Sequence, residues 1–161
     1  MMKNRALLLA LTSGLSIGTQ AMETLELEIV TPDGHSYRAE QVLDENFESF
    51  DSGAIPGETP PREYQAIRCD GPWGAMKYRL KLASGPGYQL YAKGDSLRLQ
   101  IVEHSVISED QTIAAMSIHC IDTEPRQVVK AVYEIELDRR RASAQQLQLA
   151  NGYQLEYRYL P

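Results

Sequence analysis

Residues 88–102, YQLYAKGDSLRLQIV, form two segments of alternating apolar and polar residues joined by a turn, and this stretch decides the fold. Strict alternation is typical of strands that bury one face. The turn between the segments sets Leu90 opposite Leu99 and Tyr88 opposite Ile101, so the apolar side chains of both strands share a face. The sequence therefore predicts an antiparallel hairpin whose aliphatic face is buried.

The same alternation continues on both sides of this hairpin. Near the N-terminus, Pro-Asp-Gly favours a three-residue turn that sets Ile29 opposite Tyr37. Near the C-terminus, a three-residue turn at 150–152 sets Leu149 opposite Tyr153. A two-residue Asn-Gly turn would instead set a leucine opposite a glutamine, so the three-residue turn is predicted there too.

Short strands separated by turn residues at intervals of roughly 8–12 residues predict an all-β fold. We expect one antiparallel β-sandwich or flattened barrel of about nine strands. Helical spacing is confined to 42–50, VLDENFESF, where one short helix is the alternative to strand. A strand is expected at 112–120, a loop crossing within the domain at 54–62, and a bulge near Glu103 and His104.

Residues 1–21 have the three-part composition of a secretory signal. Two cations, Lys3 and Arg5, precede an apolar run that is too short to span a bilayer stably, and small residues follow at 19–21. An N-terminal membrane anchor is the alternative. We expect a signal peptide at 1–21, one β-rich domain at 22–161, a periplasmic location, and no stable membrane insertion once the signal is cleaved.

The charge balance argues against nucleic acid as a partner. The chain has 16 basic and 22 acidic residues. Removing residues 1–21 would remove two of the basic residues and no acid, leaving 14 against 22 and a net charge of −8. Nucleic-acid-binding domains normally carry a basic excess.

The two cysteines, Cys69 and Cys120, are predicted to form a disulfide, since both lie in the part expected to reach an oxidising compartment. Closing a loop of this length would stabilise the fold by roughly 4 kcal/mol in the chain-entropy account. The alternative is a redox-active or metal-binding thiol, which His119 beside Cys120 suggests. Two cysteines this far apart do not have the ligand spacing of a zinc site.

No motif in the sequence indicates catalysis, a metal or a cofactor. HExxH, a phosphate-binding glycine loop and a dinucleotide fingerprint are all missing, and GLSIG at 14–18 lies inside the expected signal. The three histidines, His35, His104 and His119, do not have ligand spacing. We predict no catalytic residue, metal or cofactor. A catalyst assembled from residues distant in sequence is the alternative.

Residues 75–83, AMKYRLKLA, place three cations on one side of an expected strand. A four-residue turn before this strand would set Ile67 opposite Tyr78 and Cys69 opposite Met76. A turn after it would set Leu80 opposite Leu90, which completes a four-strand meander with 88–102.

In this meander Arg79 lies opposite Tyr91, and Tyr91 lies opposite Arg98. We therefore predict a solvent-facing basic surface that binds an anionic partner, formed by Lys77, Arg79, Lys81, Tyr91 and Arg98. The alternative is a solvated strand face whose long cations cover apolar surface and discourage edge pairing.

Two further sites are open to two interpretations each. Trp73, in the loop DGPWG, is either an exposed anchor for a partner or a cap on the core. Arg139, Arg140 and Arg141 either contact an anionic surface or form a solvated loop.

These features favour a non-enzymatic periplasmic binding or adaptor protein that recognises an envelope protein or glycan with an acidic surface. The second hypothesis is an assembly factor or subunit that pairs through an edge strand, with 24–30 or 153–160 as candidates. The third is an inhibitor of a periplasmic hydrolase that binds through the rigid loops DGPWG or AIPGETPPR.

Overall fold

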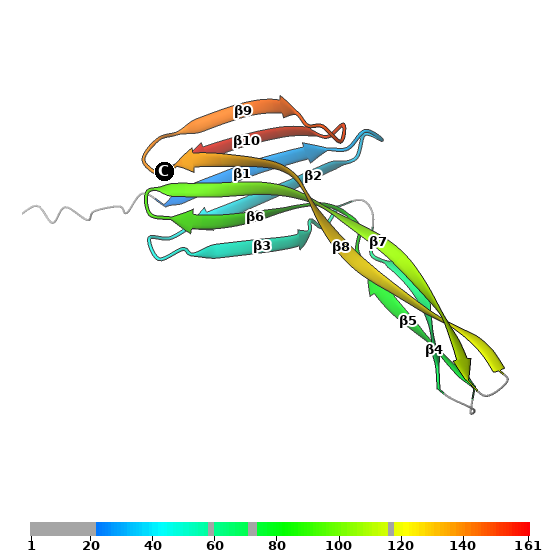
Figure 1. Cartoon of the computed structure of the whole chain (residues 1–161). Helices are drawn as coiled ribbons and strands as arrows, with labels where there is room; N and C mark the ends of the chain where they lie inside the picture. The colour runs from blue at the N-terminus through cyan, green and yellow to red at the C-terminus, as the bar shows by residue number, and fades with distance from the viewer. Residues whose placement is uncertain (1–21, 58–59, 71–73, 116–117) are drawn as a thin grey trace, which may run out of the picture.

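Two antiparallel β-sheets contain all the regular structure of the residues that the computed structural model describes, 22–57, 60–70, 74–115 and 118–161 (Figure 1). The four-stranded sheet has the order β2-β1-β10-β9, with β1 (Glu23–Val30), β2 (Ser36–Leu43), β9 (Ser143–Gln148) and β10 (Gln154–Leu160). The six-stranded sheet has the order β3-β6-β7-β8-β4-β5, with β3 (Ser49–Ala54), β4 (Arg62–Cys69), β5 (Ala75–Leu82), β6 (Gly85–Lys93), β7 (Ser96–Ala115) and β8 (Ile118–Asp138). The predicted all-β sandwich is confirmed, with ten strands.

The predicted hairpins at the centre and at both ends of the chain are confirmed. In β6 and β7, Leu90 faces Leu99. In β1 and β2, Ile29 faces Tyr37. The C-terminal hairpin closes with a hydrogen bond of 2.7 Å from the amide of Leu149 to the carbonyl of Tyr153, as the three-residue turn requires.

None of the described residues belongs to a helix with the length and hydrophobicity needed to cross a bilayer.

The core lies between the two sheets. The four-stranded sheet contributes fully buried side chains that include Leu25, Ile29, Leu155 and Tyr159. The six-stranded sheet contributes Leu90, Leu97, Leu99 and Ile101. Burying each such aliphatic side chain stabilises the fold by roughly 1.5–3 kcal/mol. No described residue of β4 or β5 joins this core, so these two strands depend on other contacts.

β7 and β8 extend well beyond the sandwich, and β4 and β5 lie against this extension (Figure 1). We call β4, β5 and the outer parts of β7 and β8, residues 105–115 and 118–128, the arm. A bulge marks its base, because Ile101 faces Tyr133 while Val102 faces Ala131. The extra residue on β8 adds local twist, which turns the outer sheet away from the sandwich. The bulge predicted near Glu103 and His104 is therefore found opposite Ile101 and Val102, and its extra residue is on β8.

The predicted pairing of β5 with β6 is wrong. β3 occupies that place beside β6, with Phe50 facing Leu90. β5 pairs with β4, and β4 joins the sheet through the facing pair Ile67 and Thr123 of β8. The two-residue connection between β5 and β6 does not form a hairpin: β5 runs along the arm toward the sandwich and β6 continues within it (Figure 1).

The register within the β4–β5 hairpin also differs from the prediction by one residue. Cys69 faces Ala75, and Tyr78 faces Ala66. A hydrogen bond of 2.9 Å from the amide of Asp70 to the carbonyl of Gly74 leaves three connecting residues where four were expected. A slip of one residue exchanges the faces of a strand relative to its partner.

Two other predicted elements are replaced by turns and strands. Within 42–50, Leu43 ends β2 and Phe50 lies in β3, and the side chain of Asp44 accepts the amide of Asn46 at 2.9 Å in the turn between them. The apparent helical spacing arises because both strands and the turn direct an apolar residue to the core. The strand expected at 112–120 is instead the end of β7 and the start of β8.

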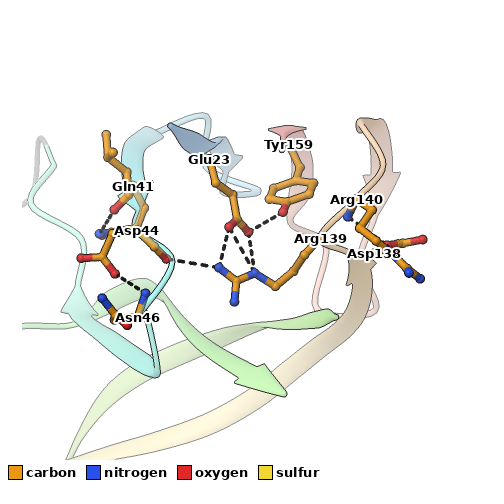
Figure 2. A network of polar contacts seen from close by, with 9 residues as sticks. Glu23, Gln41, Asp44, Asn46, Asp138, Arg139, Arg140 and Tyr159 are labelled. Atoms are coloured by element: carbon orange, nitrogen blue, oxygen red, sulfur yellow. Dashed lines mark hydrogen bonds and ion pairs between the residues drawn. The ribbon is translucent and has the colours of Figure 1, made fainter. Parts of the chain in front are cut away.

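A clamp of Glu23, Arg139 and Tyr159 ties the two sheets together at the end of the sandwich opposite the arm (Figure 2). The Arg139 guanidinium donates to both carboxylate oxygens of Glu23, with Nη2–Oε2 at 2.6 Å and Nε–Oε1 at 3.0 Å. It also donates to the carbonyl of Asp44 at 3.2 Å, while the Tyr159 hydroxyl donates to Glu23. The hydrogen bond to Glu23 raises the pKa of Arg139.

Buried tyrosines make stability depend on alkaline pH. Burial raises the pKa of Tyr88 and Tyr159, and burial together with the nearby Glu103 carboxylate raises that of Tyr153 to about 12. A pKa that is raised in the folded state means that folding favours the protonated phenol. Its contribution to the free energy of unfolding is therefore complete below the unfolded-state pKa of about 10 and is lost as the pH rises through the folded-state pKa.

We therefore expect the urea midpoint to fall as the pH rises from 10 toward 12. Circular dichroism at a series of pH values checks this, and the urea midpoint of the Tyr153→Phe variant should fall less steeply with pH. A midpoint that stays constant over this interval would contradict the burial of these phenols.

Candidate partner-binding surface

The five residues of the predicted basic surface lie on two separate parts of the six-stranded sheet. Tyr91 and Arg98 face each other on β6 and β7, as predicted. Lys77, Arg79 and Lys81 lie on β5, which three strands separate from β6 in the sheet order. Arg79 faces Gln65 rather than Tyr91. The prediction of one continuous surface is therefore wrong, and each part is considered by itself.

The sandwich part of the predicted surface is neutralised by its neighbours. Arg98 faces Glu136 on β8, and its Nε lies 3.4 Å from Oε1 of Glu134. The Tyr91 hydroxyl donates to Gln89 at 3.1 Å. Sequence reasoning missed these acids because it did not place β8 beside β7.

The arm part remains basic and exposed. β5 is an edge strand of the six-stranded sheet, and the side chains of Lys77, Arg79 and Lys81 are all exposed. Arg79 has one ion pair, with its Nη1 3.4 Å from Oε2 of Glu63, and 79% of its side chain is exposed. Such a surface pair contributes about 0–1 kcal/mol, so it leaves the guanidinium available to a partner. Neither lysine forms an ion pair with a residue that the structure describes.

The β4–β5 hairpin differs in charge from the rest of the chain. Its two strands, REYQAIRC and AMKYRLKL, hold five basic residues and one acid. The whole chain has 22 acidic and 16 basic residues. A positive strip on a protein of negative net charge attracts and orients an anionic partner.

The other side of β5 exposes apolar groups. Met76 is 55% exposed and Tyr78 is 37% exposed, although the predicted register turned both toward a core. They are exposed because the second sheet does not extend over the arm (Figure 1). A shallow groove of about 460 Å³ lies along the hairpin, lined by Glu63, Tyr64, Gln65, Lys77, Tyr78 and Arg79.

The predicted disulfide between Cys69 and Cys120 is confirmed, with a Cα–Cα distance of 6.0 Å. It joins the end of β4 to the start of β8, close to the outer end of the arm. The amide of Cys69 also donates to Oδ1 of Asp122 at 2.5 Å. Ile67 and Thr123 form the one facing pair between the described residues of β4 and β8, so the disulfide adds a covalent link where the ladder between these two strands is short.

The remaining candidate residues are dispersed. Arg139 belongs to the clamp, whereas Arg140 is exposed beside Asp95 and Asp138. Trp73 and the side chain of His119 lie outside the described residues. Among the described residues, no group of three or more His, Cys, Asp or Glu side chains is placed to hold a metal ion.

His104 is the one polar side chain that the described part of the core buries, at 4% exposure. Neither ring nitrogen has a hydrogen-bond partner among the described residues. A Cβ at Gly87 would lie 2.7 Å from its Nε2, so the glycine makes room for the ring. The ring is therefore packed on the core side of the six-stranded sheet and is almost entirely shielded from solvent.

The topology also tests the strands that were candidates for edge pairing. Residues 24–30 lie in β1, and most of 153–160 lies in β10. Both strands are internal to the four-stranded sheet, so both of their edges are already paired. The edge strands are β2, β3, β5 and β9.

Comparison of the chain with protein-family models, curated proteins and solved structures finds no match.

Proposed function

We propose that this chain is a non-enzymatic binding protein of the periplasm that recognises an anionic exported protein through the β5 side of its arm. The observation that carries the proposal is the row of exposed cations at Lys77, Arg79 and Lys81 on an edge strand outside the sandwich. The periplasmic location follows from the signal-like composition of residues 1–21.

The division of the fold supports a binding role. The sandwich supplies the buried core, while the β4–β5 hairpin contributes nothing to it. Three like charges at alternate positions of one strand repel one another, and their one ion pair within the described residues is the exposed contact between Arg79 and Glu63. Their cost is offset only when an anionic group approaches them, which is what a recognition surface requires.

Charge reversal on the arm tests the proposal. The variant Lys77→Glu/Arg79→Glu/Lys81→Glu should bind a fluorescent oligo-glutamate peptide at least about tenfold more weakly than the wild type, a loss of about 1.4 kcal/mol or more. Fluorescence anisotropy at low salt measures this affinity, and raising the salt concentration should weaken wild-type binding.

The matched control is Lys93→Glu/Arg98→Glu/Arg141→Glu, which makes the same change in net charge on exposed positions of the sandwich. It should bind the peptide within about twofold of the wild type, apart from the general effect of net charge. Equal losses in the two variants would show that only net charge matters. Tighter binding of a sulfated oligosaccharide than of the peptide would instead indicate a glycan partner. Either result would contradict the proposal.

A further inference from the structure

We infer that the arm binds its partner by adding a strand to the β5 edge, and that the added strand alternates acidic and apolar residues. This inference rests on the proposed function and names its recognition mode. Among the residues that the structure describes, β5 pairs with β4 on one side only. Its other edge therefore presents backbone N–H and C=O groups to solvent, which are the groups that an extended peptide uses to extend a sheet.

The side chains of β5 determine the pattern of the ligand. One side carries Lys77, Arg79 and Lys81, and the other carries Met76 and Tyr78, both exposed. Successive residues of an added strand also point to opposite faces. Acids at every second position would therefore face the three cations, while apolar residues between them would cover the exposed methionine and tyrosine.

A second copy of this chain does not fit the β5 edge. Pairing two β5 strands antiparallel about Arg79 sets Arg79 opposite Arg79 and Lys77 opposite Lys81. Any register that joins the apolar sides also joins the two rows of cations, and directly opposed like charges are destabilising.

The other edge strands of a folded copy are no better suited. β9 is SAQQLQ, and β2 has Arg38 two residues from Glu40, so neither offers a row of acids. β3, SFDSGA, contains a single acid, Asp51. The occupant is therefore a segment of another polypeptide, bound while extended.

Three peptides of seven residues test this recognition mode in fluorescence anisotropy. TEVELET alternates acids with apolar or small residues. TVLTEEE has the same composition and charge with its acids in one block. The third peptide is TEVELET N-methylated at alternate residues, which removes the backbone donors of one edge and keeps the side chains and charge.

The alternating peptide should bind at least about tenfold more tightly than either of the other two. In the complex, the β5 amides that do not bond to β4 should become protected from hydrogen exchange. Equal affinity of the three peptides would overturn strand addition and leave the charge-based proposal intact. Failure of all three and of oligo-glutamate to bind would overturn the proposed function itself.

Discussion

Replacing both Cys69 and Cys120 with serine is expected to lower the free energy of unfolding by about 4 kcal/mol. The two residues are 51 apart in sequence, so the cross-link removes a large loop entropy from the unfolded chain. The β4–β5 hairpin should open first, because none of its described residues lies in the sandwich core and these residues form only one facing pair with β8. Opening of this hairpin should also weaken the binding of oligo-glutamate, since the cations would no longer be held in a row.

Urea unfolding and amide exchange, read separately for the arm and the sandwich, check this expectation. Reduction of the wild type should reproduce the behaviour of the double variant. The exposed substitution Ala75→Ser, beside Cys69 in the ladder, serves as a control that should change little. Simultaneous loss of protection in β1, β10 and the hairpin would contradict the view that the disulfide secures the arm.

The second large effect is expected at the other end of the sandwich, for Arg139→Met. This change leaves the Glu23 carboxylate without its cation, in a site where that side chain is 12% exposed. Breaking a buried pair by removing one partner costs about 3–5 kcal/mol, and the partial exposure of this pair places the expected loss near 3 kcal/mol. Thermal or urea unfolding measures it.

A double-mutant cycle separates the ion pair from other effects. Adding Glu23→Gln to Arg139→Met should restore part of the lost stability, because no uncompensated charge is then buried. Arg140→Met is the matched control: it removes a neighbouring arginine whose side chain is 72% exposed, and should change stability by no more than about 0.5 kcal/mol. Equal losses at Arg139 and Arg140 would contradict the clamp.

The hairpins that the sequence predicts correctly are those whose apolar faces are buried against the second sheet. Leu90 faces Leu99 and Ile29 faces Tyr37, because a slip of one residue would expose a leucine or an isoleucine. The β4–β5 hairpin follows no such rule. Its apolar residues Met76 and Tyr78 are exposed in the arm, so burial did not fix its register, and the prediction was wrong by one residue.

The order of the strands could not be derived from local pattern. A meander is the simplest arrangement for consecutive strands, but β3 takes the place beside β6 that the meander assigns to β5. This single exchange divides the predicted basic surface. The cations of β5 were identified correctly as exposed, whereas the acids Glu134 and Glu136 that neutralise Arg98 lie on a strand more than 30 residues away in sequence.

Amide hydrogen exchange at β5 in the unbound protein tests the central claim most directly. If β5 is a free edge, amides from Ala75 to Leu82 should alternate along the strand, with those bonded to β4 exchanging slowly and those between them exchanging fast. Uniformly slow exchange along β5 would show that a second strand covers it, as in the meander, and would contradict both the arm and the binding surface placed on it.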